Sequence, residues 1–289
     1  MKTYLYFRTY WGKDSLTGLS GRNILAKTKM ELVSTCVNSL ELNRLKNLHT
    51  CACVDNSTNE YTRYLESVFD EVFHTSEGFD VDDHRGKWPV FGGMGNLIEV
   101  LKFIASRGHH DDDIIMIVED DYLFRVNGLK DWVDACVKLE GFVSPFDHPD
   151  RYIRNDDLFW RKSDISIVDN IHFRTIEANT SVVGGRYKFF RRSAVLRKIP
   201  RLHVWFFWPG RLLGKELPSI DRVFYRRAYL WLRIKLFSPI PGFATHLSKF
   251  VPPENSSVLK KGVTLPETQL SPGVDWEKRF YDLAKQYTE

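Results

Sequence analysis

The stretch that decides the fold is residues 114–124, IIMIVEDDYLF, in which five apolar residues run directly into three acidic ones. An apolar, β-branched run of this length predicts a buried strand over residues 114–118. Glu119, Asp120 and Asp121 then lie at its carboxyl end, where crowded like charges are unfavourable unless a cation or a shared proton compensates them. Such oxygen ligands suit Mg²⁺ or Mn²⁺, and substrate phosphates and water usually complete the coordination shell of these ions. The stretch therefore predicts a carboxylate-held metal beside a diphosphate, and the alternative is a polar loop after a strand.

Strands and helices alternate on the amino-terminal side of this stretch. Alternating or continuous apolar patterns predict strands over 3–9, 48–54 and 71–74, and helical spacing predicts helices over 23–42, 61–69 and 96–106. Such an order predicts an α/β fold with a mixed, mostly parallel sheet flanked by helices. Ligands of these sheets bind at the carboxyl ends of the strands, which is where the acidic triplet lies.

The carboxyl-terminal part of the chain has a less regular order of predicted elements. Helices are expected over 129–138, 192–198, 221–232 and 276–287, strands over 141–144 and 233–237, and a hairpin around Asn170 within 164–184. The sequence has no internal repeat, low-complexity linker or abrupt change of composition. These patterns predict one α/β domain over residues 1–289.

Composition excludes several classes of protein. With 289 residues, 43% hydrophobic and 27% charged, the chain is unlike disordered, collagenous or coiled-coil proteins. The 41 basic and 37 acidic residues give too mild an excess to indicate a nucleic-acid partner. No apolar leader or span of roughly 18 apolar residues is present, which predicts a cytoplasmic protein, in the host cytoplasm if the gene is viral. Four cysteines without a CxxC pair are expected to be buried and reduced.

Three other charged or aromatic segments allow two interpretations each. Asp111, Asp112 and Asp113 precede the strand, so they are expected to form a solvated loop rather than a site. Basic residues within 186–201 and 222–235 are typical of a solvated helix face, and the alternative is contact with a diphosphate or an anionic membrane. The run HVWFFW at 203–208 is expected to fill the core, with Trp205 and Trp208 as the alternatives that stack on a sugar.

A strand that runs into Glu119-Asp120-Asp121 resembles the DxD-type motif of GT-A glycosyltransferases, in its ExD form. The similarity extends to VSPFDHPDRY at 143–152 and to the order of elements from Thr3 to about His246. The chain is similar in particular to small glycosyltransferases of large DNA viruses, such as chloroviruses, and of some bacteria. The resemblance implies one Rossmann-like GT-A domain, with a nucleotide-sugar half at 1–125 and an acceptor half with a C-terminal helix at 126–289.

The resemblance also implies roles on the donor side. Residues at the ends of the first two strands would contact the nucleoside, and a glycine-rich helix start would approach the donor: Arg8, Thr9, Tyr10, Asp55, Gly92, Gly93 and Asn96. Asp121 would be the direct metal ligand, and Glu119 would contact the ribose or metal-bound water. Asp120 would support the donor or its sugar. His246, after a Pro/Gly turn, would bind the metal or the diphosphate, although a lone histidine is often structural.

On the acceptor side, the resemblance implies a general base and a sugar-binding loop. Asp221 begins a helix where such folds place the base, although an Asp there is also explained by the helix dipole. Asp147 is the second catalytic candidate. Asp147, His148 and Asp150 suit sugar hydroxyls, with Trp205 and Trp208 as further acceptor contacts.

The function implied is a metal-dependent glycosyltransferase that uses Mn²⁺ or Mg²⁺, a UDP-sugar and a glycan hydroxyl, in glycan biosynthesis. One alternative is a sugar-1-phosphate nucleotidyltransferase, which usually has a Gly-rich basic loop after the first strand, where this chain has Tyr10-Trp11-Gly12-Lys13. The other is a non-catalytic carbohydrate-binding protein whose acidic cluster holds a structural cation.

Overall fold

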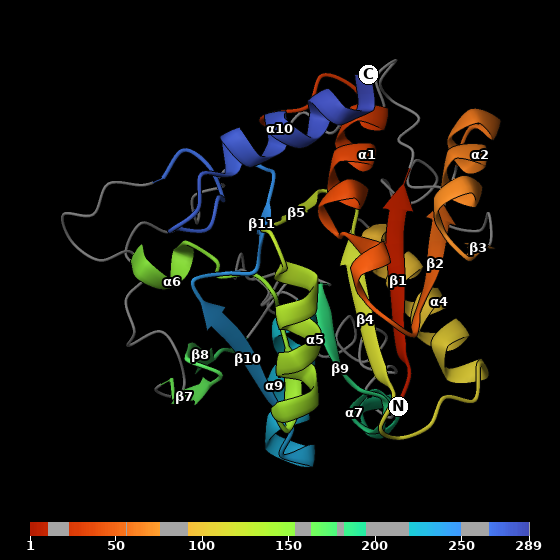
Figure 1. Ribbon diagram of the computed structural model, residues 1–289. Helices are drawn as coiled ribbons and strands as arrows, with labels where there is room; N and C mark the ends of the chain where they lie inside the picture. Colours follow the sequence, from red (N-terminus) through yellow and green to blue (C-terminus); the bar gives the residue numbers. More distant parts are fainter. Residues whose placement is uncertain are drawn as a thin grey trace, which may run out of the picture.

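The computed structural model describes residues 1–10, 23–55, 57–75, 92–153, 163–177, 182–194, 220–249 and 266–288 (Figure 1). Their strands form a nine-stranded sheet in the order β3-β2-β1-β4-β9-β6-β10-β8-β7 and a two-stranded sheet of β5 and β11. The strands are β1 (Thr3–Tyr10), β2 (Leu48–Asp55), β3 (Glu71–His74), β4 (Ile114–Glu119), β5 (Tyr122–Phe124), β6 (Gly141–Val143), β7 (Ile165–Val168), β8 (Ile171–Thr175), β9 (Val183–Arg186), β10 (Lys235–Ile240) and β11 (Ala244–His246).

The large sheet has a parallel half and a mixed half. Strands β3, β2, β1 and β4 are parallel, whereas β9 is antiparallel to both β4 and β6. Strand β10 is parallel to β6, and the hairpin β7–β8 closes the far edge through antiparallel pairs. This arrangement confirms the predicted α/β fold with a mixed, mostly parallel sheet flanked by helices. The predicted division of the chain at residue 125 stays a prediction.

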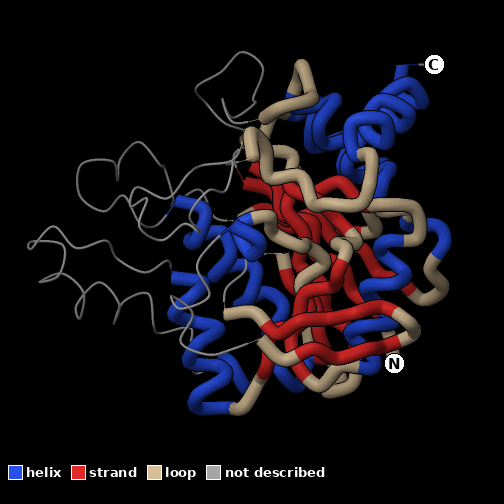
Figure 2. Tube along the Cα trace, turned by 90° about the vertical axis from the view of Figure 1, so that its left-hand side faces the viewer, coloured by secondary structure: helices blue, strands red, loops and turns tan. Residues whose placement is uncertain are grey.

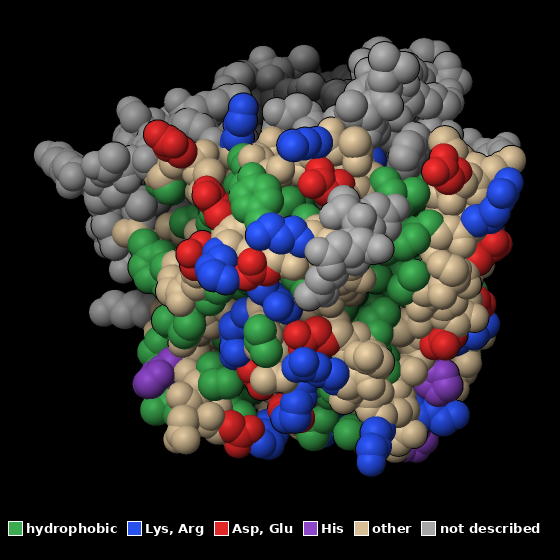
Figure 3. Space-filling model, turned by 45° about the horizontal axis from the view of Figure 1, so that its top comes forward, with side chains coloured by type: hydrophobic (Ala, Val, Ile, Leu, Met, Phe, Trp, Pro, Cys, Tyr) green, Lys and Arg blue, Asp and Glu red, His purple; other side chains and the backbone are tan. Residues whose placement is uncertain are grey.

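Helices cover both faces of the sheet (Figure 2). Their bounds are α1 (Lys29–Ser39), α2 (Asn59–Val68), α4 (Gly92–Ser106), α5 (Gly128–Lys138), α6 (Asp150–Ile153), α7 (Tyr187–Ser193), α9 (Ile220–Leu232) and α10 (Trp276–Thr288), with a 3₁₀ turn at Leu42–Arg44. None of the described helices is long and apolar enough to cross a membrane. The face seen in Figure 3 carries acidic and basic side chains interspersed among apolar ones.

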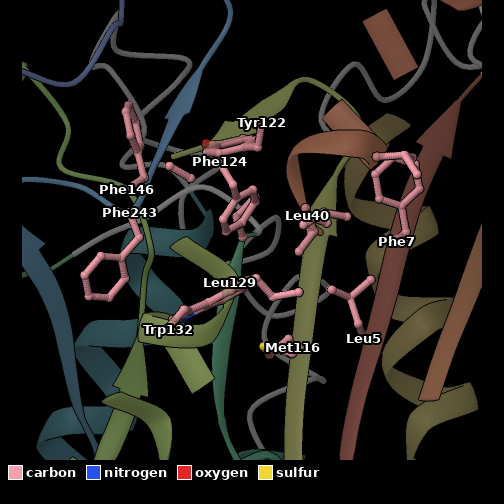
Figure 4. Close-up of a cluster of buried hydrophobic side chains, with 14 of the residues drawn as sticks. Leu5, Phe7, Leu40, Met116, Tyr122, Phe124, Leu129, Trp132, Phe146 and Phe243 are labelled. Carbon is pink, nitrogen blue, oxygen red and sulfur yellow. The ribbon is translucent and has the colours of Figure 1, made fainter. Parts of the chain in front are cut away.

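Strand alternation divides the core into two layers. On one face, Leu5 and Phe7 of β1 and Met116 of β4 pack with α1, α2 and α5 (Figure 4). On the other face, Tyr6 and Ile117 pack with α4, α7 and α9. Successive side chains of a strand point to opposite faces, so this division also fixes the direction of the polar residues that end each strand.

Helices α1 and α7 differ from their predicted bounds. Helix α1 begins at Lys29 rather than residue 23, because the Thr28 side chain accepts the backbone N–H of Glu31 at 3.1 Å and caps the helix there. The helix expected over 192–198 is α7, which begins directly after β9 and buries Tyr187, Phe189 and Phe190. Residues 195–198 of that prediction lie outside the described residues.

Other sequence predictions agree with the structure. The hairpin expected around Asn170 is β7–β8, and its turn residues Asp169 and Asn170 have positive φ angles of 50° and 64°. All four cysteines are free and buried. The last helix, α10, packs on α1 through Trp276 and Phe280, so the carboxyl-terminal segment covers the end of the sheet that carries β5 and β11.

Candidate functional site

The three acidic residues after β4 point in different directions and have different partners. Glu119 ends β4 opposite Arg8 of β1, whose Nη1 donates to Glu119 Oε1 at 2.9 Å. Arg8 itself is buried. Burial raises the pKa of Glu119 above its ordinary value, and Asp121 raises it further, against the opposing charge of Arg8. Glu119 is thus a carboxylate held by one cation and crowded by its acidic neighbours.

Asp120 belongs to the opposite face of the sheet. Its Oδ2 accepts from Lys29 Nζ at 2.6 Å and from Thr9 Oγ1 at 2.5 Å. Since the Thr9 hydroxyl donates to Asp120, the hydroxyl of Tyr61 donates in turn to Thr9. Lys29, Thr9 and Asp120 are all buried. The ion pair connects α1 to the end of β4, and the two hydrogen bonds of Thr9 connect β1 to the same carboxylate and to α2.

Asp121 faces His246, which lies on β11. The antiparallel pairing of β5 and β11 sets Tyr122 opposite His246, and His246 Nε2 lies 2.8 Å from Asp121 Oδ2. The other oxygen, Oδ1, is buried and has no hydrogen-bond partner among the described residues. Burial opposes ionisation of Asp121, but the charge of His246 and its hydrogen bond hold the pKa of Asp121 below its ordinary value.

The His246 ring is fixed on several sides. Gln269 Oε1 lies 2.9 Å from its Nδ1, and Ser248 Oγ lies 3.1 Å from the same nitrogen. The Tyr122 ring stacks on the imidazole with centroids 4.9 Å apart. Burial lowers the pKa of His246, but the Asp121 carboxylate and the hydrogen bonds outweigh it and raise the pKa to about 9. The raised pKa favours the imidazolium form, whose two N–H groups would be directed at Asp121 and Gln269.

The chemistry of the Asp121–His246 pair fits a divalent cation, which would take the place of the proton on His246 Nε2. A hydrogen-bond acceptor on Nδ1 orients Nε2 as a ligand, and Gln269 supplies that acceptor here. The unpartnered Oδ1 of Asp121 is a second donor atom. Within the described ranges, no three His, Cys, Asp or Glu side chains form a metal cluster, so the protein would supply few ligands and the substrate the rest.

The predicted nucleoside-side residues divide between the two faces. Arg8, Glu119 and Asp55, which ends β2, continue the face that packs on α4. Burial raises the pKa of Asp55 and Glu99 of α4 adds to the rise, against Arg8. Thr9 points to the other face, toward Asp120. Tyr10 ends β1, and its side chain lies outside the described residues.

The glycine-rich segment predicted to approach the donor is helical. Helix α4 begins at Gly92, so Gly92, Gly93 and Asn96 lie in its first turns rather than in a turn before it. Of these residues the structure describes the backbone. The helix therefore starts four residues earlier than the pattern at 96–106 predicts.

In the predicted acceptor loop after β6, Asp147 is buried whereas Tyr152 is exposed. Asp147 is fully buried and accepts from Tyr152 Oη at 2.5 Å and from Arg174 of β8. Burial raises the pKa of Asp147, against Arg174 and Tyr152. His148 is half-buried, with its ring 5.0 Å from that of Phe146. Asp147 is therefore engaged by a cation and a phenol, and its catalytic role stays a prediction.

The remaining predicted residues cannot be compared with a described side chain. Asp150 begins α6 and Asp221 is the second residue of α9, both with side chains outside the described set. Trp205 and Trp208 lie outside the described residues altogether. The roles given to these four residues stay predictions.

Three residues of the site were missed from the sequence. Lys29, Arg174 and Gln269 lie 91, 27 and 23 positions from the residues they contact, Asp120, Asp147 and His246. None belongs to a local motif with its partner. The sequence indicated only that such partners must exist, because buried carboxylates require cations and a histidine ligand requires an acceptor for its other nitrogen.

No protein-family model matches this sequence. No curated protein matches it either. Solved structures similar to this chain include one described as the crystal structure of 4-diphosphocytidyl-2C-methyl-D-erythritol synthase. It is 8% identical over 67% of this chain and 78% of that chain, with a TM-score of 0.33. A likeness this weak carries no argument about function, which therefore depends on the geometry of the site.

Proposed function

We propose that this chain is a metal-dependent glycosyltransferase of the GT-A type that transfers a sugar from a nucleoside diphosphate sugar to a glycan hydroxyl. The observation that carries the proposal is the Asp121–His246 pair at the carboxyl end of β4, in which a buried Asp121 oxygen has no partner among the described residues. Ligands of parallel sheets bind at this end of the strands. UDP-sugars are the first donors to test.

Mn²⁺ or Mg²⁺ would be held by Asp121 and His246, with Glu119 beside them. A divalent cation bound there would neutralise the charge that develops on the leaving diphosphate. The role of Gln269 is to keep His246 Nε2 directed at Asp121, and that of Tyr122 is to hold the plane of the ring.

The donor nucleoside would lie on the α4 face of the sheet. Arg8 lies near the carboxyl end of β1, Asp55 and Glu119 end the neighbouring parallel strands β2 and β4, and all three point to this face. They supply hydrogen-bond donors and acceptors for ribose hydroxyls and a base. The first turn of α4, with Gly92 and Gly93, would offer backbone N–H groups to the diphosphate.

An inverting transfer needs a general base for the acceptor hydroxyl, and Asp221 and Asp147 are the candidates. Asp147 could serve only after the contacts of Arg174 and Tyr152 rearrange, because both engage it in the structure. The acceptor would be a glycan, for which Asp147, His148 and Asp150 supply polar contacts.

Nucleotide release from UDP-, GDP- and dTDP-sugars, with Mn²⁺ or with a chelator, tests this function, because slow donor hydrolysis requires no acceptor. Metal-dependent release from one donor is expected. Release of pyrophosphate from a nucleoside triphosphate and a sugar 1-phosphate would instead establish a nucleotidyltransferase. Sugar binding without any nucleotide binding would establish a carbohydrate-binding protein.

A further inference from the structure

The carboxyl-terminal end of α9 exposes two large apolar side chains next to each other. Trp231 is 64% exposed and Leu230 is 39% exposed. Single exposed apolar residues are ordinary on protein surfaces, but here two consecutive large apolar residues are exposed at the end of one helix, which we call the α9 tip. Earlier in the same helix, Tyr225 and Ala228 are buried in the core layer that covers this face of the sheet.

Arginines surround this tip. The Arg227 guanidinium lies 5.2 Å from the centroid of the Trp231 ring, and Arg192 of α7 donates to the backbone oxygen of Leu232 at 2.8 Å. Arg226 is exposed on the same helix, and Arg233 follows its last turn.

The arginines at the tip differ from the other cations nearby. Arg186, Lys188 and Arg191 are paired with acidic residues, namely Glu140 for the first two and Asp111 for the third. Within the described part of the chain, Arg192, Arg227 and Arg233 form no ion pair. The apolar tip therefore has a rim of positive charge that the described acidic residues do not neutralise.

Arg233 has the left-handed backbone conformation that favours glycine. Its φ is 58°, and the bonds from Arg233 N to Tyr229 O at 3.0 Å and from Ile234 N to Ala228 O at 3.1 Å form the left-handed turn that ends the helix. Any residue with a Cβ atom is strained in this conformation. A cation near a helix carboxyl terminus is favourable by itself, but the dipole does not account for the exposed Trp231 and Leu230.

The α9 tip lies at the amino ends of the parallel strands, whereas Asp121 lies at their carboxyl ends. Strand β10 starts just after α9 and is parallel to β6, and β6 and β4 are both antiparallel to β9. Strand β10 therefore runs parallel to β4, and the end of α9 lies at the amino edge of the parallel strands, low in Figure 1. The tip is thus separate from the candidate metal site.

We propose that the α9 tip (Leu230 and Trp231) and its rim of Arg192, Arg227 and Arg233 dock on the anionic headgroups of a membrane surface. Tryptophan and leucine suit the boundary between headgroups and acyl chains, and guanidinium groups bind lipid phosphates in bidentate geometry. Nucleic-acid phosphates would satisfy the arginines but would leave Leu230 without a partner. Docking at this edge leaves the carboxyl ends of the strands directed away from the membrane, accessible to a soluble donor.

Flotation of the full chain with vesicles tests the proposal. The chain is expected to float with phosphatidylcholine vesicles that contain phosphatidylglycerol, and to be released by salt, but not with phosphatidylcholine alone. Trp231→Glu should lower the bound fraction by about tenfold or more, as expected for an apolar side chain that leaves the interface. Ile167→Glu is the matched control, since Ile167 on β7 is also 64% exposed.

Arg233→Gly removes one charge at a position where glycine is the least strained residue, so this variant should fold at least as well as the parent. It is expected to weaken flotation and to reduce its dependence on salt. Equal losses in Trp231→Glu and Ile167→Glu would overturn the proposal, as would equal binding to neutral vesicles. Binding of an oligonucleotide without binding of any vesicle would also overturn it, because the tip would then be a nucleic-acid contact.

Discussion

The two ends of strand β4 each carry three consecutive acidic residues, and the two triplets have different fates. At the amino end, Asp111 pairs with Arg191 in an exposed contact whose side chains are 46% and 60% exposed. At the carboxyl end, Asp120 pairs with Lys29 in a contact whose side chains are 12% and 8% exposed. The ion pair at the amino end is therefore exposed and the one at the carboxyl end is buried, while Asp113 at the amino end is buried and, among the described residues, accepts backbone N–H groups rather than a side-chain cation.

This difference shows that the direction of the strand decides what an acidic triplet can do. Before β4, Asp111 and Asp112 lie near the arginines of β9 and α7, and Asp113 accepts backbone N–H groups. After β4 the chain enters the edge where β1, β2 and the β5–β11 pair converge, so each acid requires its own cation or hydrogen bond: Arg8, Lys29 and His246.

Removing the buried ion pair should give the largest effect on stability. Asp120→Ala leaves the Lys29 ammonium buried without a counterion, so we expect the free energy of unfolding to fall by about 3–5 kcal/mol. Asp111→Ala, which removes the exposed pair at the other end of β4, should cost about 1 kcal/mol or less. Urea unfolding followed by circular dichroism measures both.

A double variant sharpens this test. Asp120→Leu with Lys29→Met removes both charges at once, so it should be more stable than either single change, because neither partner is left buried alone. If Asp120→Ala and Asp111→Ala lowered the free energy of unfolding equally, the buried ion pair would contribute no more to stability than the exposed one.

The second prediction concerns activity. Asp121→Asn keeps the shape of the side chain but removes its charge, so metal-dependent nucleotide release should fall by about 100- to 1,000-fold, as when one electrostatic contact to developing charge is lost. Steady-state release from the accepted donor measures it. Asp112→Asn is the control at the other end of β4. Full activity in Asp121→Asn would exclude Asp121 as a metal ligand.

The sequence predicted the strand and the position of the acidic residues at its carboxyl end because these features are local, and the function of these residues stays a prediction. The pattern at 71–74 matched β3, and the run at 114–118 fell within β4. The direction of a buried strand then places Glu119, Asp120 and Asp121 at the carboxyl edge. His246 was predicted from a resemblance, and the structure places it against Asp121.

The partners of these residues could not be predicted because they depend on tertiary contacts. Nothing near Thr28 and Lys29 indicates that the lysine turns inward to Asp120, and nothing near Gln269 indicates a contact with His246. Asp147 was predicted as a catalytic or sugar-binding residue, and the structure adds a contact that the sequence did not indicate, from Arg174 of the β7–β8 hairpin. A sequence shows where charge must be compensated, but not which residue compensates it.

The third prediction tests whether Gln269 orients the proposed metal ligand. Gln269→Leu removes the acceptor at His246 Nδ1 while keeping a side chain of similar size, so Mn²⁺ affinity should fall by about tenfold, the lower end of what such supporting hydrogen bonds contribute. Calorimetric titration of Mn²⁺ into the protein measures this without any turnover. The control is Glu267→Gln, which changes an exposed residue of the same segment and should leave the affinity unchanged. Unchanged affinity in Gln269→Leu would remove Gln269 from the site.

The smallest expected effect is a pH dependence at the amino end of β4. Asp113 accepts the backbone N–H of Lys2 at 2.8 Å and of His110 at 3.0 Å. Burial alone would raise the pKa of Asp113, but these hydrogen bonds hold it below its ordinary value. A carboxyl whose pKa is lower in the folded state contributes stability above its unfolded pKa, and this contribution disappears as the pH falls through the folded pKa.

Asp113→Asn should therefore be less stable than the parent by about 1 kcal/mol at neutral pH, since it exchanges charged acceptors for a neutral one. The difference should shrink as the pH falls below about 4, where the unfolded carboxyl of the parent begins to take up its proton. Urea unfolding of both proteins across this range measures the change. Because the hydrogen bonds to Lys2 and His110 tie the amino terminus to β4, a difference that stayed constant with pH would mean that their geometry, and not the charge of Asp113, stabilises this end of the strand.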